Sequence, residues 1–130
     1  MKEQRAFSVG LRRGVVTANE NATARYVAQL MDKHNIGAVV IMRGEKLVGI
    51  VSERDIARRI VASGLSPAKA KVKNFMTKNV VTADFKEGLD KIYEILCHAK
   101  FRHLPIVNGG KLVGIVSQRD VLYSEIRKKD

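Results

Sequence analysis

Two aspartates stand at the same place in two copies of one short motif. Ser52 and Asp55 follow the run Leu-Val-Gly-Ile-Val, and Ser117 and Asp120 follow an identical run 65 residues later. Such a serine can cap a helix while the aspartate three residues on accepts a hydrogen bond from the serine amide. A carboxylate can also bind two neighbouring hydroxyls, and the free amides at a helix start suit a phosphate. Capping and ligand binding are therefore both open to these residues.

The repeat extends well beyond this motif. Val15–Ala18 returns as Val80–Ala83, again 65 residues later, and residues 15–58 can be laid over residues 80–123 without a gap. The apolar run before each serine is short and β-branched, which favours a buried strand. The chain is therefore predicted to be an internal duplication in which each motif joins a buried strand to a helix.

Each half is expected to fold in the order β-α-β-β-α. Asn19 or Asn21 is predicted to cap the first helix, and Asp84 with Glu87 forms a predicted capping box in the second half. A hairpin is expected at residues 108–110, because Asn-Gly strongly favours such a turn. The expected strands are 15–17, 38–42, 47–51, 80–82, 103–107 and 112–116, and the expected helices are 22–34, 52–63, 84–100 and 118–129.

Helical spacing predicts which side chains of the longer helices are buried. In the lead-in, residues 1–14, alternating apolar residues favour a short edge strand at Phe7, Val9 and Leu11. The predicted buried stripes are Ala24, Val27, Ala28 and Met31 in one helix, and Leu89, Ile92, Tyr93, Leu96 and Ala99 in the other.

Length and composition limit the class of protein. The chain has 130 residues, enough for one compact unit with a hydrophobic core. Its single cysteine, Cys97, rules out an internal disulfide and fits a reducing compartment. No apolar run approaches the roughly 20 residues of a membrane span, and the first residues lack the apolar core of a signal peptide. We therefore expect a cytoplasmic protein.

The chain is strongly basic. Its net charge is +11, from 24 Lys and Arg against 13 Asp and Glu, and such an excess concentrates anions near the surface. The basic residues are scattered along the chain, so a solvated surface explains the charge as well as a nucleic-acid interface does.

The sequence shows no recognisable arrangement for catalysis. One cysteine and three scattered histidines give no zinc spacing, and there is no phosphate-binding loop or nucleophile–base pair. Glu53 and Asp55 are two residues apart on the predicted helix and do not face each other. We expect no metal site, no required cofactor and no enzymatic activity.

The repeated order β-α-β-β-α, with Gly-Ile-Val-Ser-x-Arg-Asp at the end of each last strand, resembles a pair of cystathionine-β-synthase (CBS) domains, or Bateman module. Asn74–Thr82 resembles the usual start of such a domain, and Arg102–Val107 resembles its second strand. The resemblance spans nearly the whole chain and implies a stand-alone pair of α/β (α+β) repeats packed about a pseudo-twofold axis. It implies a first domain at 1–64, a connector at 65–74 and a second domain at 75–130.

The resemblance also implies a ligand and an oligomer. CBS pairs commonly bind AMP, ADP or ATP in the clefts between their domains, less often S-adenosylmethionine, and two pairs usually form a homodimer. Asp55 and Asp120 occupy the positions that the family uses for the ribose. The phosphate is assigned to the two helix starts and to Ser52, Ser117, Arg54, Arg119, Arg102 and His103, and the base to Thr17, Thr82, Gly37 and Ala38.

Structural roles remain open for these residues. The Ser–Asp pairs can serve as caps alone, Arg54 and Arg119 more often form surface ion pairs, and Thr17 and Thr82 can simply end strands. The repeats also differ, because uncharged Gly37-Ala38 stands where the second repeat has Arg102-His103. We therefore expect inequivalent clefts, with a phosphate bound better where Arg102 and His103 point.

Three functions follow. The first is an adenine-nucleotide sensor of energy or metabolites that regulates an unidentified protein partner. The second is a nucleic-acid-binding module, whose affinity would fall steeply with salt. The third is a ligand-free dimerising adaptor, in which Asp55 and Asp120 act only as caps. Because the Ser–Asp motif is duplicated in the context of a CBS pair, the first function is favoured.

Overall fold

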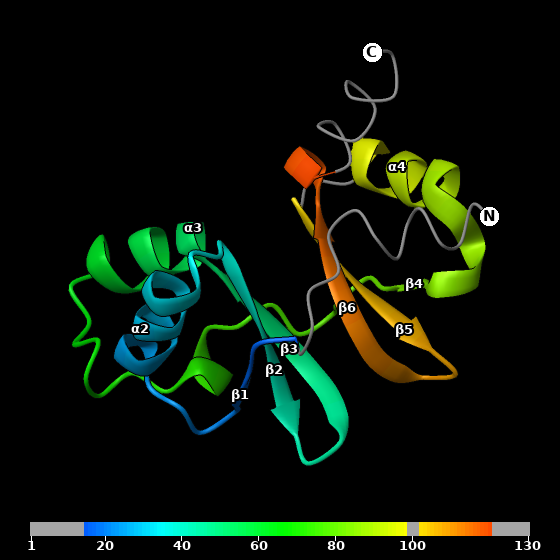
Figure 1. Cartoon of the computed structure of the whole chain (residues 1–130). Helices are drawn as coiled ribbons and strands as arrows, with labels where there is room; N and C mark the ends of the chain where they lie inside the picture. Colours follow the sequence, from blue (N-terminus) through cyan, green and yellow to red (C-terminus); the bar gives the residue numbers. More distant parts are fainter. Residues whose placement is uncertain (1–14, 99–101, 121–130) are drawn as a thin grey trace. The chain divides into compact units, whose positions relative to one another are not determined.

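The computed structural model describes residues 15–98 and 102–120, apart from the side chain of Leu89 (Figure 1). The described residues belong to two compact units, one formed by residues 16–80 and the other by Val15 and the described residues from Val81 onward. The expected edge strand at Phe7–Leu11, the helix end near residue 100 and most of the helix expected at 118–129 lie outside the described residues.

Both units contain a three-stranded sheet of the same topology. In the first, β1 (Thr17–Asn19) pairs in parallel with β2 (Ala38–Arg43), and β2 pairs antiparallel with β3 (Lys46–Ser52). In the second, β4 (Ala83–Asp84), β5 (His103–Asn108) and β6 (Lys111–Ser117) repeat this arrangement. The registers also correspond, since Ala38 lies opposite Ser52 and His103 lies opposite Ser117. The duplication is therefore confirmed at the level of strand register.

Helices connect and follow these strands. The first unit has α2 (Ala24–His34), α3 (Glu53–Asp55) and the π-helical turn η1 (Ile56–Val61), which continues α3 and corresponds to the predicted helix after Ser52. A short 3₁₀ turn, η2 (Val72–Asn74), follows. The second unit has the 3₁₀ turn η3 (Phe85–Glu87) and α4 (Gly88–His98).

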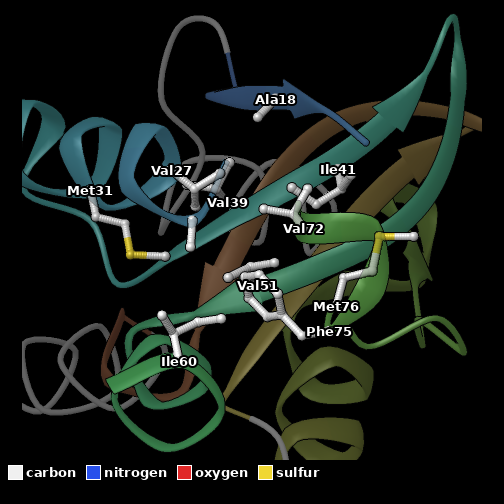
Figure 2. Packing of buried hydrophobic residues seen from close by; sticks show 11 residues of the cluster. Ala18, Val27, Met31, Val39, Ile41, Val51, Ile60, Val72, Phe75 and Met76 are labelled. Atoms are coloured by element: carbon white, nitrogen blue, oxygen red, sulfur yellow. The ribbon is translucent and has the colours of Figure 1, made fainter. Parts of the chain in front are cut away.

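The core of the first unit lies between its sheet and its helices (Figure 2). Val27 and Met31 of α2 pack on Val39 and Val51 of the sheet, and Ile60 of η1 is fully buried beside them. The predicted buried face of α2 is confirmed for three of its residues, while Ala28 is only half-buried. The second unit has a corresponding cluster made of Ala83, Ile92, Leu96, Leu104, Ile106 and Val116.

The cap predicted for α2 was wrong. Thr23 is the N-cap, and its hydroxyl accepts a hydrogen bond from the Tyr26 amide at 3.1 Å. Asn19 instead ends β1, and its side chain accepts from the Asn21 amide at 2.8 Å, forming a local turn. The helix therefore begins at Ala24, two residues later than predicted.

The first strand of each repeat also starts later than predicted. Thr17–Asn19 pair with Val40–Met42, and Ala83–Asp84 pair with Ile106–Val107. The apolar residues that suggested earlier strands precede this pairing, and Val16 packs against the core from the side. The limits of these two strands are set by pairing with the neighbouring strand. The local apolar pattern gives no information about that pairing.

The start and the exposed face of α4 also differ from the prediction. The Asp84–Glu87 capping box is present, with the Asp84 amide donating to Glu87 Oε1 at 3.1 Å, but it closes η3 rather than α4. Gly88, at φ 82°, separates the two helical segments. Tyr93 is 42% exposed, not buried, whereas Ile92 and Leu96 of the same helix are buried in the core cluster and Ile95 packs against it. Its predicted burial was wrong.

The two hairpins turn at glycines. Gly109 and Gly110 both have positive φ and form the turn between Asn108 and Lys111. The hairpin predicted at residues 108–110 is therefore confirmed, and its two positive-φ positions are both glycines, as a type I′ turn requires.

Residues 65–80 are part of the first unit and pack on its helix α2 and its strand β3. The Ala24 amide donates to Ala70 O at 2.8 Å, and Thr77 exchanges two backbone hydrogen bonds with Ile50 of β3, at 3.0 and 3.1 Å. Val72, Phe75 and Met76 are buried in its core (Figure 2). Most of the segment predicted as a connector thus contributes to the first unit, while the proposed domain limits at 64 and 74 stay predictions.

This packing makes Gly49 of β3 intolerant of a side chain. A Cβ at this position would lie 2.7 Å from Met76 Cγ and 3.1 Å from the Thr77 carbonyl oxygen. We expect Gly49→Ala to lower the free energy of unfolding by about 1–3 kcal/mol, the usual cost of overpacking. Urea denaturation measures this loss. Gln29→Ala, on the exposed face of α2, is the matched control, and equal stability of the two variants would contradict the close packing of residues 72–77 on β3.

Candidate functional site

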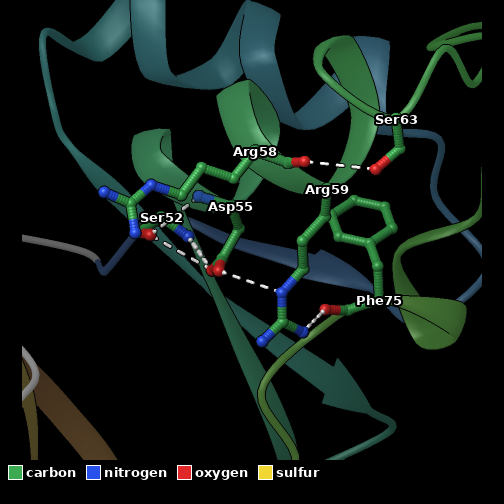
Figure 3. A network of polar contacts seen from close by, with 6 residues as sticks. All are labelled: Ser52, Asp55, Arg58, Arg59, Ser63 and Phe75. Carbon is green, nitrogen blue, oxygen red and sulfur yellow. Dashed lines mark hydrogen bonds and ion pairs between the residues drawn. The ribbon is translucent and has the colours of Figure 1, made fainter.

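The Ser52–Asp55 pair forms a complete capping box where β3 passes into α3 (Figure 3). The Ser52 amide donates to Asp55 Oδ2 at 2.8 Å, and the Asp55 amide donates to Ser52 Oγ at 3.2 Å. The Ser52 hydroxyl lies 3.1 Å from the same Oδ2 atom. The box therefore uses one carboxylate oxygen, and Asp55 Oδ1 takes no part in it.

The second repeat builds the same box. The Ser117 amide donates to Asp120 Oδ2 at 3.1 Å, and the Asp120 amide donates to Ser117 Oγ at 3.0 Å. Both aspartates are half-buried at the start of a helical turn. Capping and ligand binding need not exclude each other, because in each box the capping hydrogen bonds use Oδ2 and not Oδ1.

The predicted base-binding residues lie at the same end of each sheet as the boxes. Because β1 and β2 are parallel and β3 runs against them, Thr17, Ala38 and Ser52 all lie at one end of the first sheet. The Gly37 carbonyl oxygen accepts from the Glu53 amide at 2.9 Å, which fixes the strand beside the helix start. The first repeat thus has Thr17, Ala38 and Ser52 at one sheet end, with Gly37 beside the helix start.

The second repeat places Arg102 and His103 at the corresponding end. His103 begins β5 opposite Ser117, and the Arg102 carbonyl oxygen accepts from the Gln118 amide at 2.9 Å. Arg102 is exposed and His103 is half-buried. Thr82 immediately precedes β4 and is exposed. The difference expected between the repeats is therefore located beside the carboxylates.

Arg54 and Arg119 are both exposed, and no ion pair links either to another described residue. Each arginine follows its capping serine by two residues. No contact among the described residues directs either side chain toward a capping box. Their assignment to a phosphate stays a prediction.

Sequence reasoning missed Arg59. Its Nε lies 3.6 Å from Asp55 Oδ1, and its Nη1 donates to the Phe75 carbonyl oxygen (Figure 3). The side chain of Asp55 is 17% exposed and that of Arg59 is 51% exposed. The sequence did contain a sign of this ion pair, because an arginine four residues after an aspartate lies beside it on a helix. The second repeat has Ser124 at the position of Arg59.

No three His, Cys, Asp or Glu side chains within 15–98 and 102–120 are grouped so that they could bind a metal ion. Among the same residues, no helix has the length and apolar character needed to cross a bilayer.

Comparison with known proteins places these features in a family. The CBS domain profile matches residues 7–62 and 72–126. An uncharacterized protein of Methanopyrus kandleri, MK0525, is 34% identical over 93% of this chain, and the chain spans 64% of that protein.

Two solved structures show the same fold. A putative signal-transduction protein with CBS domains from Burkholderia ambifaria matches 91% of this chain and 87% of its own, at 31% identity and a TM-score of 0.85. The CBS domain pair of protein MJ0100, solved with 5′-methylthioadenosine and S-adenosyl-L-methionine, matches 92% of this chain and 94% of its own, at 29% identity and a TM-score of 0.80. With two mixed sheets in the same order and two profile matches, the chain belongs to the CBS domain family as a tandem pair.

Proposed function

We propose that this CBS pair is a regulatory module that binds an adenine nucleotide (AMP, ADP or ATP) and signals its presence to a protein partner. The observation that carries the proposal is the duplicated Ser–Asp box, which holds a half-buried carboxylate at a helix start with Oδ1 outside the capping hydrogen bonds. A carboxylate oxygen outside the box can accept hydroxyl hydrogen bonds, and neighbouring helix amides favour a phosphate.

A relative supports the class of ligand. The MJ0100 pair was solved with two adenosine derivatives, S-adenosyl-L-methionine and 5′-methylthioadenosine. These compounds share the adenosine ribose, which is the part that Asp55 and Asp120 are proposed to bind here. A preference for phosphate-bearing ligands is proposed from Arg102 and His103, because a guanidinium offers several donors to a phosphate.

The module is proposed to act without catalysis and as a homodimer. A ligand regulates such a module only if it binds one arrangement of the protein more tightly than another. The regulated partner then distinguishes the two arrangements. Neither step requires a reaction, and the described residues that carry the proposal are hydrogen-bond acceptors and cations.

The proposal predicts a thermal shift with adenine nucleotides. At about 100 times its dissociation constant, a ligand stabilises the folded state by about 2.7 kcal/mol, so AMP, ADP or ATP should raise the melting temperature by several degrees. Asp55→Ala or Asp120→Ala should abolish the shift at its own site. Because loss of the cap itself costs about 1 kcal/mol, each variant is compared with its own ligand-free melting temperature.

Gln29→Ala is the control, since it changes an exposed residue of α2 outside the predicted site and should keep the full shift. An unchanged melting temperature with every adenosine ligand would overturn the proposed function. In that event, binding of nucleic acid that weakens steeply with salt would favour the basic surface instead.

A second prediction concerns Arg59, which neutralises the oxygen left by the first capping box. An exposed ion pair of this spacing is worth about 0.3–0.5 kcal/mol. Arg59→Ser, which introduces the residue of the second repeat, should therefore raise affinity at Asp55 about twofold. Calorimetric titration in an Asp120→Ala background isolates this site, with Arg58→Ser as the neighbouring control. Weaker binding in Arg59→Ser would mean that the guanidinium holds the ligand instead of competing with it.

A further inference from the structure

The positive charge of the first unit comes from one stretch of its sequence. From Val16 to Asp55, five Lys and Arg are balanced by five Asp and Glu. Between Asp55 and Asp84, by contrast, the chain has six Lys and Arg and no Asp or Glu. Residues 62–71 of this stretch connect η1 to the 3₁₀ turn η2 (Figure 1). The connection between these two turns therefore brings cations to the first unit without any carboxylate among them.

Backbone hydrogen bonds fix this connection beside the start of α2. The Arg25 amide donates to the Pro67 carbonyl oxygen at 3.0 Å. The Val72 amide donates to the Ala22 carbonyl oxygen at 2.9 Å, just before the helix begins. Because backbone carbonyls already accept from the first amides of α2, the helix end itself is not open to an anion. Attraction for an anion at this place must come from side chains.

The lysines of the connection face solvent because the residues between them are anchored in the unit. Lys69 and Lys71 are exposed, whereas the intervening Ala70 is half-buried and Val72 is fully buried. Lys71 also lies opposite Thr23 in an antiparallel bridge. The positions of these two lysines are thus set by the backbone that carries them.

A carboxylate beside these lysines is already paired. The Lys73 amide donates to the Glu20 carbonyl oxygen at 3.1 Å, and the Glu20 carboxylate accepts from Arg43 Nε at 2.6 Å. The hydrogen bond from Arg43, and more weakly the charges of Arg43 and Lys73, lower the pKa of the Glu20 carboxyl. The Glu20 side chain is only 16% exposed, against 63% for Arg43. The solvent-facing groups at this place are therefore mainly cations.

Five cations from separate parts of the chain are gathered around the start of α2. We call them the basic patch: Arg25, Arg43, Lys69, Lys71 and Lys73. None of its three lysines forms an ion pair with another described residue. The second repeat has Asp90 and Asn108 at the positions of Arg25 and Arg43. The fold that the two repeats share therefore does not require the basic patch.

An exposed apolar side chain accompanies the basic patch. Leu65 is 52% exposed and lies two residues before Pro67, whose carbonyl oxygen accepts from Arg25. Cations beside an apolar side chain suit a polypeptide that carries carboxylates and an apolar side chain of its own. A nucleic-acid backbone would use the cations but not Leu65. A second copy of this chain does not fit, because a twofold contact would face the patch with itself and like charges repel.

We propose that the basic patch and Leu65 bind an acidic segment of another protein that carries an apolar side chain among its carboxylates. The carboxylates face Lys69 and Lys71, and the apolar side chain lies against Leu65. The inference rests on the proposed function, because it identifies the surface by which the regulated partner is bound. The complementary charges select an acidic partner and accelerate its association.

The experiment measures the binding of two short fluorescein-labelled peptides to the whole chain by fluorescence anisotropy. Both peptides are rich in glutamate, and only one has leucines among the glutamates. The peptide with leucines should bind more tightly. Lys69→Glu/Lys71→Glu should raise its dissociation constant about tenfold or more, because attraction becomes repulsion.

Lys33→Glu/Lys111→Glu is the matched control. It makes the same change of net charge at two exposed positions, one in the last turn of α2 and one in the second unit. At physiological salt, distant exposed charges are screened, so this variant should keep the dissociation constant within about twofold of the wild type.

Leu65→Ser tests the apolar part of the surface. It should weaken binding of the peptide with leucines by about threefold or more, because an apolar contact is lost. Binding of the leucine-free peptide should stay the same. A general loss of folding would weaken both peptides, so the difference between them distinguishes a lost contact from a damaged protein.

Equal losses in the two double variants would overturn the inference, since net charge alone would then explain the binding. An absence of peptide binding would also overturn it. So would a single-stranded oligonucleotide that binds more tightly than either peptide and is lost in Lys69→Glu/Lys71→Glu, because the patch would then be a nucleic-acid site. Nucleotide binding is measured separately by thermal shift. An intact shift without peptide binding rejects this inference alone, and the reverse result rejects the nucleotide proposal alone.

Discussion

The structure depends on one repeated interaction, the capping box that joins the last strand of each repeat to the following helical turn. Serine and aspartate exchange backbone hydrogen bonds across this junction, at 2.8 and 3.2 Å in the first repeat and at 3.1 and 3.0 Å in the second. These bonds satisfy amides that would otherwise lack partners. They also hold a carboxylate at the sheet end, where Gly37-Ala38 or Arg102-His103 begins the neighbouring strand. Capping therefore positions the group that is proposed to bind a ligand.

The sequence was informative wherever structure follows from local chemistry. The sequence predicted the strands around Val39–Ile41 and Leu104–Ile106 and both Ser–Asp boxes. It also predicted that the two repeats correspond in register. Apolar runs, helix caps and an internal duplication can all be recognised in the sequence itself. Where structure depends on a distant partner, prediction failed. The first strand of each repeat started later than predicted, and Phe75 and Met76 entered the first core. Likewise, the Arg59 contact with Phe75 joins residues 16 positions apart, which no local pattern indicates. The cap of α2 was missed for a local reason, since Asn19, Asn21 and Thr23 are all residue types that cap helices.

The internal duplication explains why the two repeats share one strand order and register. Amino-acid differences between the repeats explain why they are not equivalent. Arg59 and Ser124, Ala28 and Tyr93, and Gly37-Ala38 and Arg102-His103 occupy equivalent positions with different charge or volume. The register of the sheets is unchanged by these differences. The caps and the buried strands are alike in the two repeats, and these differences lie at the sheet ends and on the helices, where a ligand and a partner chain are proposed to bind.

Arg59 connects the proposed ligand-binding carboxylate of Asp55 to the backbone at Phe75. It contacts Asp55 Oδ1 on one side and the Phe75 carbonyl oxygen on the other, and the adjoining Thr77 is hydrogen-bonded to β3. A ribose hydroxyl that binds Asp55 Oδ1 competes with the guanidinium for the same oxygen. Occupancy at Asp55 and the attachment of Phe75 are then thermodynamically linked, since a ligand that binds more tightly when Arg59 is displaced must also favour its displacement. The second repeat has a serine at this position, so the same link cannot form there through an arginine.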